Sequence, residues 1–469
     1  MAPISYVSTR GTAPELQFAD VLLAGLANDG GLYVPSQWPS LTIGDLERFA
    51  SMSYADIAID VMWPFVEGSI DREDFSSIVA DAYATFESDE VVPLVDLGDN
   101  FWLAELFHGP TLAFKDIALQ LVGRLFDHEL TRRGDKVTIV GATSGDTGSA
   151  AIEALRDRPT AEVFILHPAG RVSDVQRRQM TTVHSSNVHN IAVQGTFDDC
   201  QDMVKALFAD DHFRDSRNLS AVNSINWARV MAQIVYYVTT TVRLGGGAGR
   251  PVAFSVPTGN FGNVFAGYGA QRMGTPISQF VVASNRNDIL TQFLTTGSMT
   301  IGEVHPTLSP SMDIQVSSNL ERLLFEIHGR DGAAIAELMS RFRSEGTVSV
   351  SVERLELLAD HWSAARVDDA QTAATIADLY EQMGMLLDPH TAVGLAAARS
   401  ARSDASVPMV VLATAHPAKF PDAVEAATGV RPPLPAHLAD LFDRTERFEV
   451  CANDFATVRG YIEATLDHA

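Results

Sequence analysis

The spacing of apolar positions changes character along the chain near residue 96. Before that point, apolar residues recur at helical intervals in two short stretches, 43–49 and 56–65, and a glycine pair at 30–31 breaks the chain ahead of them. This pattern predicts a mostly helical N-terminal domain over residues 1–95. No motif within it indicates chemistry by itself.

From residue 96 onward, β-branched runs alternate with amphipathic stretches of helical length. Strands are expected at 136–140, 162–166, 190–193, 252–256, 279–283 and 408–412, and helices at 149–156, 174–180, 197–208 and 226–242. Such alternation is typical of parallel βαβ units with helices on both faces of a sheet. The sequence therefore predicts an α/β fold for a catalytic core over residues 96–469.

Two regions of this core are expected to be distinct. A smaller lobe is expected at roughly residues 140–225. Prolines at 306 and 310 and a helical pattern at 319–327 interrupt the alternation, which indicates an insertion at roughly residues 296–350. Further helices are expected at 352–359 and 372–383.

Composition and charge narrow the classes of partner. The 469-residue chain is 46% hydrophobic and 20% charged, as in ordinary globular proteins, and its formal net charge is −25. Such an acidic chain is not expected to bind nucleic acid or an anionic membrane. The sequence has two cysteines, Cys200 and Cys451, which are too few and too far apart for a disulfide framework or a cysteine metal site. No metal is expected. Without a visible signal peptide or membrane-spanning run, a cytoplasmic enzyme is predicted.

Lys115 is the first candidate for chemistry. It lies between the Gly109-Pro110 turn and an amphipathic stretch, and Leu112 and Phe114 surround it with apolar bulk. An amine in such surroundings loses charge stabilisation and becomes a better nucleophile toward a carbonyl, as a Schiff base requires. Taken alone, the stretch favours the alternative, a surface lysine whose amine extends from the start of a helix into water.

A glycine-rich loop at 141–148 follows the expected strand 136–140 and opens a helix. Backbone N–H groups at a helix start bind anions, and the hydroxyls of Thr143, Ser144 and Thr147 add donors. The loop is neither a Walker A motif nor a dinucleotide-binding GxGxxG. The same glycines would also suit a tight strand-to-helix turn without a ligand.

A second loop of this type, at 257–263, also lies between a strand and a helix. Gly259 and Gly262 leave room for Asn260 and Asn263 and several backbone amides to face one phosphate. Two anion-accepting loops and a candidate Schiff-base lysine together indicate pyridoxal phosphate with an amino-acid substrate. One loop would hold the cofactor phosphate and the other the substrate carboxylate.

A third loop follows the last expected strand, where ligands bind in open α/β sheets. Its Thr414 carries a hydroxyl that, unlike a carboxylate, would leave a pyridine nitrogen unprotonated. Taken singly, His416 is interpreted as a histidine that caps the loop, and Lys419 as a solvated cation.

Taken together, seven segments resemble the threonine synthases of the long type found in bacteria and fungi, within the fold type II pyridoxal-phosphate enzymes. They are DGGLYVP (29–35), FHGPTLAFKD (107–116), ATSGDTG (142–148), NSIN (223–226), PTGNFGN (257–263), DPH (388–390) and ATAHPAKF (413–420). Their order and spacing extend the resemblance over nearly the whole chain. The implied architecture is two parallel-sheet α/β lobes with the cofactor between them, plus the N-terminal domain.

The resemblance also implies roles for individual residues. Lys115 would bind pyridoxal phosphate covalently and shuttle protons. The cofactor phosphate would be held by Gly259, Asn260, Phe261 and Asn263, with Thr414 facing the pyridine nitrogen. The substrate carboxylate would be held by Thr143, Ser144, Gly145, Asp146 and Thr147, although relatives outside this family often have asparagine in place of Asp146, whose role stays open. Candidates for the substrate phosphate are Ser173, Gln176, Arg229 and Lys419.

The implied reaction converts O-phospho-L-homoserine and water into L-threonine and phosphate, by γ-elimination followed by β-addition of water. The rival within the same chemistry is a threonine-synthase-like phospho-lyase that releases 2-oxobutyrate and ammonia. A non-enzymatic binding protein that keeps the fold is a third possibility, which the intact Lys115 and both loops disfavour. The expected assembly is a monomer or a homodimer.

Overall fold

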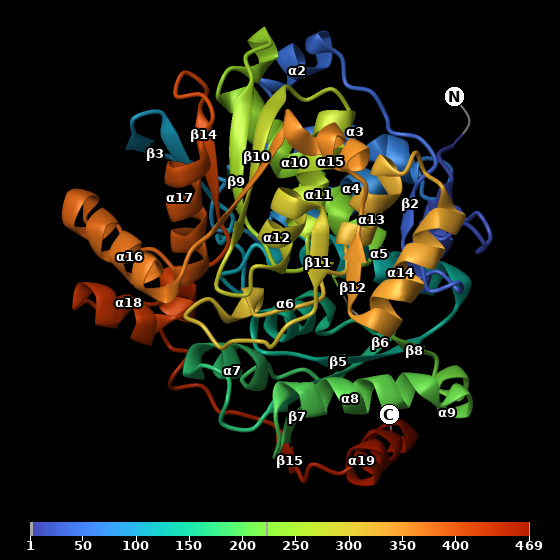
Figure 1. Cartoon of the computed structure of the whole chain (residues 1–469). Coiled ribbons are helices and arrows are strands. Elements are labelled where there is room, and N and C mark those ends of the chain that lie inside the picture. The colour runs from blue at the N-terminus through green and yellow to red at the C-terminus, as the bar shows by residue number, and fades with distance from the viewer. Residues whose placement is uncertain (1–2, 222–223, 469) are drawn as a thin grey trace. The chain divides into compact units, whose positions relative to one another are not determined.

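The computed structural model describes residues 3–221 and 224–468, so Asn223 of the NSIN motif lies outside the described residues. The helices and strands form two compact units (Figure 1). The larger unit contains the described residues of Met1–Gly109 and Ser224–Pro432, and the smaller unit those of Pro110–Asn223 and Pro433–Ala469. The domain boundary at residue 95 and the lobe limits at 140–225 stay predictions.

The N-terminal part of the larger unit is built mainly from four helices. They are α1 (Phe18–Ala24), α2 (Ile43–Phe49), α3 (Tyr54–Val66) and α4 (Arg72–Tyr83). Helix α2 is capped by Thr42, whose side chain and backbone exchange hydrogen bonds with Asp45, the reciprocal pairing that stabilises a helix start. A short antiparallel pair, β1 (Tyr6–Ser8) and β2 (Tyr33–Pro35), completes this part.

A six-stranded sheet forms the centre of the larger unit. Its order is β13 (Trp362–Arg366), β10 (Ile277–Ser284), β9 (Val252–Pro257), β14 (Met409–Ala413), β4 (Phe101–Glu105) and β3 (Leu94–Gly98). All neighbouring strands are parallel except β3 and β4, which form an antiparallel edge hairpin. The predicted parallel sheet is therefore confirmed, with the hairpin as an addition.

Successive residues of β9 face opposite sides of this sheet and contact different helices. The Ser255 hydroxyl donates to the Gly394 carbonyl of α17 (Pro389–Ala401) at 2.7 Å. The adjacent Phe254 ring lies 4.8 Å from the Tyr237 ring of α10 (Trp227–Arg243). Helices thus cover both faces, as Figure 1 shows for α17 on one side and α10 and α11 (Gly262–Arg272) on the other.

The smaller unit contains a five-stranded sheet in which every pair is parallel. Its order is β15 (Glu449–Cys451), β7 (Val188–Val193), β6 (Ala161–Pro168), β5 (Val137–Ala142) and β8 (Leu219–Ser220). A shared apolar core packs α8 (Phe197–Ala209) and α19 (Phe455–His468) against these strands. On α5 (Lys115–Arg133), Gly123 allows close contact with α6 (Asp146–Leu155), because a Cβ at that position would meet the Ala154 backbone.

Several features differ from the sequence expectations. Helix α6 begins at Asp146 rather than at residue 149, because Gly145 and the loop amides already turn the chain into the helix. Helix α17 was not predicted. The region expected as an insertion contains β11 (Ser298–Thr300), β12 (Thr347–Ser349), α13 (Leu320–Ile327) and the unpredicted α14 (Gly332–Glu345). Among the described residues, no helix has the length and apolarity that a membrane crossing requires.

Candidate active site

Lys115 is the first residue of α5, and its side chain is only 11% exposed. Its Nζ lies 3.2 Å from Oδ2 of Asp146 and 5.3 Å from the centre of the Phe114 ring. A cation at a helix N-terminus is unfavourable on its own, so this position needs a compensating anion. Because Nζ contacts a buried carboxylate, Lys115 is not a surface lysine that extends into water.

Asp116 fixes the segment that leads into the lysine. Its carboxylate accepts hydrogen bonds from the Thr111 N–H at 2.8 Å and from the Thr111 hydroxyl at 2.7 Å, and it is fully buried. The Thr111 carbonyl in turn accepts from the side-chain amide of Gln179 at 3.0 Å, on α7 (Asp174–Thr181). The backbone before Lys115 is therefore anchored at two points within the smaller unit.

Both carboxylate oxygens of Asp146 have partners. Lys115 contacts Oδ2, and the Gln176 side-chain amide donates to Oδ1 at 2.8 Å. Gly145 makes this contact possible, because a Cβ there would lie 2.7 Å from Nε2 of Gln176 and the residue has φ +140°. Gln176 therefore orients Asp146 toward the lysine, a role that the sequence did not indicate.

The loop predicted to bind the substrate carboxylate contains two kinds of residue. Thr143 is buried, and its hydroxyl accepts hydrogen bonds from the N–H groups of Gly145 at 3.0 Å and Gly148 at 2.9 Å. Ser144 is exposed and Thr147 is half-buried at the start of α6. Thr143 thus shapes the loop, whereas Ser144 and Thr147 are the hydroxyl residues that a ligand can reach.

The second glycine loop lies in the larger unit, and two of its backbone carbonyls accept side-chain hydrogen bonds. The Ser317 hydroxyl donates to the Gly259 carbonyl at 2.7 Å, and the Asn319 side-chain amide donates to the Asn260 carbonyl at 2.8 Å. A Cβ at Gly259 would lie 2.8 Å from the Ser311 carbonyl, so only glycine fits. The sequence did not single out Ser317 or Asn319, which have no motif of their own.

Phe261 and Asn263 shape the start of α11. Phe261 is the N-terminal cap of α11 and has φ +63°. The buried Phe261 ring stacks on the Trp362 ring, with centroids 5.8 Å apart. The Asn263 Oδ1 accepts hydrogen bonds from Tyr236 and Tyr237 at 2.5 and 2.9 Å. Its Nδ2 is buried without a hydrogen-bond partner, and such a donor is costly unless a ligand satisfies it.

The DPH motif (388–390) is connected by hydrogen bonds to the segment that packs against Gly259. Asp388 caps α17 and accepts from the ring of His390, whose Nδ1 lies 2.9 Å from Oδ1. The His390 Nε2 then accepts the Ser311 N–H at 3.2 Å, next to Gly259. The motif is therefore structural, and it connects α17 to the glycine loop through a buried histidine.

Thr414 directly follows β14, as predicted for the carboxyl end of the last strand, and it is 6% exposed. Two residues further, burial and the nearby charge of His108 lower the pKa of His416 to about 4. The His416 Nδ1 accepts the Ala418 N–H at 3.1 Å. His416 is thus a neutral capping histidine, and Thr414 is the hydroxyl of this loop.

The four candidates for the substrate phosphate are divided between the units. Ser173 and Gln176 lie in the smaller unit, where the Ser173 hydroxyl caps α7 by accepting the Gln176 N–H at 3.3 Å. Arg229 and Lys419 lie in the larger unit, and both are buried. Burial lowers the pKa of Arg229 to about 10, and its Nη1 has no hydrogen-bond partner.

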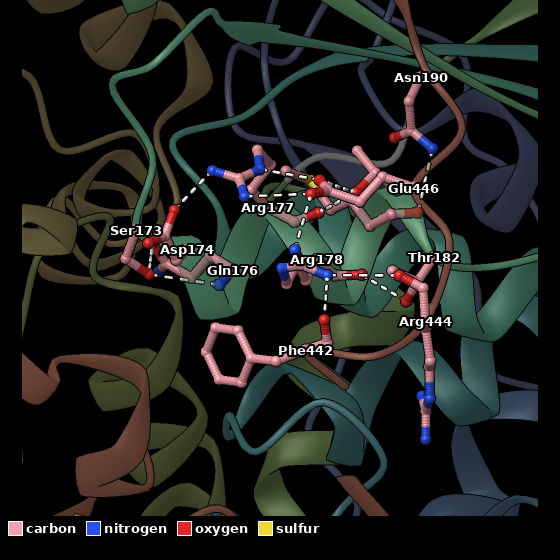
Figure 2. Close-up of polar contacts among 12 residues, drawn as sticks. Ser173, Asp174, Gln176, Arg177, Arg178, Thr182, Asn190, Phe442, Arg444 and Glu446 are labelled. Atoms are coloured by element: carbon pink, nitrogen blue, oxygen red, sulfur yellow. Dashed lines mark hydrogen bonds and ion pairs between the residues drawn. The ribbon is translucent and has the colours of Figure 1, made fainter. Parts of the chain in front are cut away.

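A C-terminal segment holds α7 in the smaller unit (Figure 2). Glu446 accepts hydrogen bonds from the Arg177 guanidinium at 2.8 and 3.1 Å and from the Thr181 hydroxyl at 2.8 Å. The Arg178 guanidinium donates to the Phe442 carbonyl at 2.9 Å. Since α7 also carries Gln176, the position of the Asp146 contact depends on this segment.

The donor sets of both units fit pyridoxal phosphate. In the larger unit, an unpartnered buried amide at Asn263 and a glycine loop that opens a helix suit a phosphate group. In the smaller unit, the Lys115 amine suits the aldehyde, and Asp146 suits the positive charge that the amine carries. None of these features requires a metal ion.

Comparison with known proteins gives consistent matches along the chain. A family profile described as "Pyridoxal-phosphate dependent enzyme" matches residues 91–341, "Threonine synthase N terminus" matches 5–83, and "Threonine synthase, C-terminal" matches 391–462. The threonine synthase of Pseudomonas aeruginosa is 57% identical over 458 residues, which cover 97% of each chain.

Solved structures agree with these matches. The threonine synthase of Brucella melitensis, solved with bound pyridoxal phosphate, has a TM-score of 0.96 at 52% identity and covers 98% of this chain and 99% of its own. The yeast threonine synthase has a TM-score of 0.95 at 39% identity over the full length of both chains. The predicted family, fold and cofactor are confirmed, and the chain belongs to the threonine synthase family of pyridoxal-phosphate-dependent lyases with fold type II architecture.

Proposed function

We propose that the chain converts O-phospho-L-homoserine and water into L-threonine and phosphate, and that Lys115 carries its pyridoxal phosphate. The observation that carries this proposal is the buried contact between the Lys115 amine and Asp146, which Gln176 orients. When bound, the cofactor supplies the electron sink that acidifies the substrate carbons next to its amino group.

Lys115 is the general base in this proposal. Its Nζ would accept the proton from the substrate Cα and later return a proton to the substrate. Asp146, 3.2 Å away, stabilises the ammonium that forms at Nζ. A positioned base of this kind contributes roughly 10²–10⁴-fold to the rate. Asp146 thereby gains the role that the sequence left open.

The helix start at α6 holds the substrate carboxylate. Ser144 and Thr147 reach the surface of the loop, and the dipole of a ten-residue helix favours an anion at this end. Thr143 and Gly145 contribute by keeping the loop in shape, since the Thr143 hydroxyl already accepts two backbone N–H groups.

The cofactor phosphate belongs to the loop around Gly259 and Asn260, with Phe261 and Asn263 completing the start of α11. The Gly259 and Asn260 carbonyls accept hydrogen bonds from Ser317 and Asn319. The backbone amides of the loop therefore keep one arrangement before a ligand binds. Thr414 would offer a neutral hydroxyl to the pyridine nitrogen of the cofactor, a partner that favours the uncharged form of that nitrogen.

Arg229 is the strongest of the four candidates for the substrate phosphate. Its guanidinium is buried, and Nη1 has no hydrogen-bond partner, an arrangement that an oxyanion would compensate. The Gln176 side-chain amide donates to Asp146, and the Ser173 hydroxyl caps α7. Both residues therefore stabilise the smaller unit rather than bind the substrate phosphate.

Incubation of the purified protein and cofactor with O-phospho-L-homoserine tests the reaction. Threonine, phosphate and 2-oxobutyrate are measured together. Threonine that matches phosphate mole for mole is the expected result. Phosphate accompanied by 2-oxobutyrate and little threonine would show that the chain is instead a phospho-lyase.

A further inference from the structure

A pocket of about 350 Å³ lies in the larger unit, in the size range of small-molecule sites. Its walls come from the N-terminal segment, β11, α13 and α14. Among the described residues that line it, none is a residue predicted for cofactor or substrate. A ligand of this pocket would therefore differ from the cofactor and the substrate.

The surface of this pocket is aliphatic and accessible. Leu26, Ile301 and Val316 line it, and they are 46%, 40% and 48% exposed. Deeper in, Leu32 and Leu320 are 3% and 1% exposed. Apolar side chains exposed together in a concave site indicate a ligand that removes them from water.

The polar side of the pocket is cationic. Arg10 forms a two-point ion pair with Glu321, through Nε at 3.1 Å and Nη2 at 2.9 Å, and Thr9 donates to the same carboxylate. The Arg10 Nη1 lies beside Gly30, which also lines the pocket. This buried pair neutralises itself but keeps guanidinium donors at the wall.

Arg343 adds a charge that Arg10 and Glu321 do not cancel. On α14, Met339, Phe342 and Arg343 line the pocket at helical intervals, whereas Arg341 lies on the same helix but outside the lining. In a chain with a net charge of −25, a cationic corner beside an aliphatic surface is unusual. It complements a molecule with an apolar tail and one negative charge.

We propose that this pocket binds a small aliphatic carboxylate, with the carboxylate at Arg343 and Arg10 and the tail against Leu26, Ile301 and Val316. The site is also coupled to the cofactor loop. Ser317 lines the pocket, and its hydroxyl donates to the Gly259 carbonyl at 2.7 Å. A ligand that shifts Ser317 changes the position of the loop assigned to the cofactor phosphate, so this coupling rests on the proposed function.

Calorimetric titration of the holoenzyme with octanoate tests the binding site, in saturating inorganic phosphate so that other anion sites are filled. Saturable one-site binding is expected, and octylammonium should bind at least about fivefold more weakly because it meets a cationic corner. Arg343→Gln should weaken octanoate binding by about three- to tenfold. Arg341 is an exposed arginine of the same helix outside the lining, so Arg341→Gln should leave octanoate binding unchanged.

Filling the groove provides a second test. Val316→Trp should abolish saturable binding, and Val352→Trp, at a 68% exposed valine outside the lining, should not. Absence of saturable octanoate binding, equal binding of octylammonium, equal effects of the two arginine variants, or intact binding by Val316→Trp would each overturn the site.

The coupling has its own measurement. The dissociation constant of pyridoxal phosphate, followed by visible absorption of the full-length apoprotein, is compared with and without octanoate. A change of about fivefold or more is expected, together with the same factor in the octanoate dissociation constant when cofactor is added. Identical cofactor dissociation constants would overturn the coupling while the calorimetric result still decides the site.

Discussion

At the scale of single residues, the candidate site depends on where a side chain is absent. Gly145 leaves the space through which the Gln176 amide reaches Asp146, and Gly259 leaves the space against the Ser311 carbonyl. In both loops the sequence indicated glycines that expose backbone amides. The structure adds that each glycine also admits a particular neighbour, which no pattern in one sequence reveals.

Gly145→Ala should therefore reduce both stability and activity. Its φ of +140° strains any side chain, and its Cβ would displace the Gln176 amide. We expect a loss of roughly 1–3 kcal/mol in the free energy of unfolding, and roughly 10²-fold in kcat/KM if the Asp146 carboxylate moves by an ångström. Denaturant unfolding and steady-state kinetics measure these quantities.

Gly134→Ala is the matched control, because Gly134 has φ +73° with nothing within 4 Å of a new Cβ. It should lose about 1 kcal/mol of stability and keep kcat/KM. If Gly145→Ala keeps kcat/KM as well, Gln176 does not position Asp146.

His416 gives a pH-dependent prediction at the same scale. Its pKa is lowered to about 4, mainly by burial, from an ordinary value of 6.5. Between these values the unfolded chain binds a proton that the folded chain does not, so the free energy of unfolding falls as pH drops from 6.5 toward 4. One such group contributes a slope of up to about 1.4 kcal/mol per pH unit.

His416→Asn keeps an acceptor for the Ala418 N–H but removes the titrating group. Its free energy of unfolding should therefore vary less with pH over this interval than that of the unsubstituted chain. Urea unfolding at several pH values gives the comparison, and parallel curves for the two proteins would contradict the assigned pKa.

At the scale of elements, α7 links the C-terminal segment to the lysine. Its Gln176 donates to Asp146, and its Thr181 donates to Glu446. Its Arg177 also donates to Glu446 (Figure 2). The chain predicts α7 itself well, because its helical spacing and its Ser173 cap are local. The partner in the C-terminal segment could not be predicted, since it lies far away in the sequence.

Glu446→Gln should weaken this link. The Glu446 side chain is 18% exposed, and its hydrogen bond with Arg177 holds its carboxyl pKa below the ordinary value. We expect a loss of about 1–3 kcal/mol in the free energy of unfolding and a lower kcat/KM, because α7 positions Gln176. Unfolding and kinetic measurements on the same preparations test both effects.

Asp174→Asn serves as the control for the same arginine. Asp174 also pairs with Arg177, but its side chain is 70% exposed, so its removal should change stability by less than about 0.5 kcal/mol. Equal losses in the two variants would show that the C-terminal segment has no special role.

The elements that the sequence predicted and those it missed differ in a physical way. Strands such as β6 and β9 and helix α10 have long periodic patterns, and they form within a few residues of the expected limits. Helix α17 is rich in alanine and contains Gly394, and such small residues give no clear helical spacing of large apolar side chains. Its Asp388 cap and Pro389 start were the readable signals.

At the scale of the whole molecule, the chain passes between the two units three times. Residues 433–469 return to the smaller unit after the larger one is complete, and their strand β15 pairs with β7 over only three residues. So short a strand has no readable alternation, and only long-range contacts decide which unit it joins. The order of motifs, by contrast, was sufficient to predict the family, the cofactor and both glycine loops.

The proposed attachment of the cofactor depends on Lys115. Lys115 belongs to the smaller unit, whereas the loop at Gly259 and Thr414 belong to the larger one. Two further lysines serve for comparison: Lys419 is buried in the larger unit, and Lys136 is exposed and directly precedes β5.

Borohydride reduction of the holoenzyme, followed by mass mapping of the peptide that carries the reduced cofactor, identifies the lysine that binds pyridoxal phosphate. We expect one labelled peptide that contains Lys115, and a Lys115→Ala protein that folds but retains no cofactor after reduction and dialysis. A label on Lys136 or Lys419, or an unchanged label in Lys115→Ala, would contradict the assignment of Lys115.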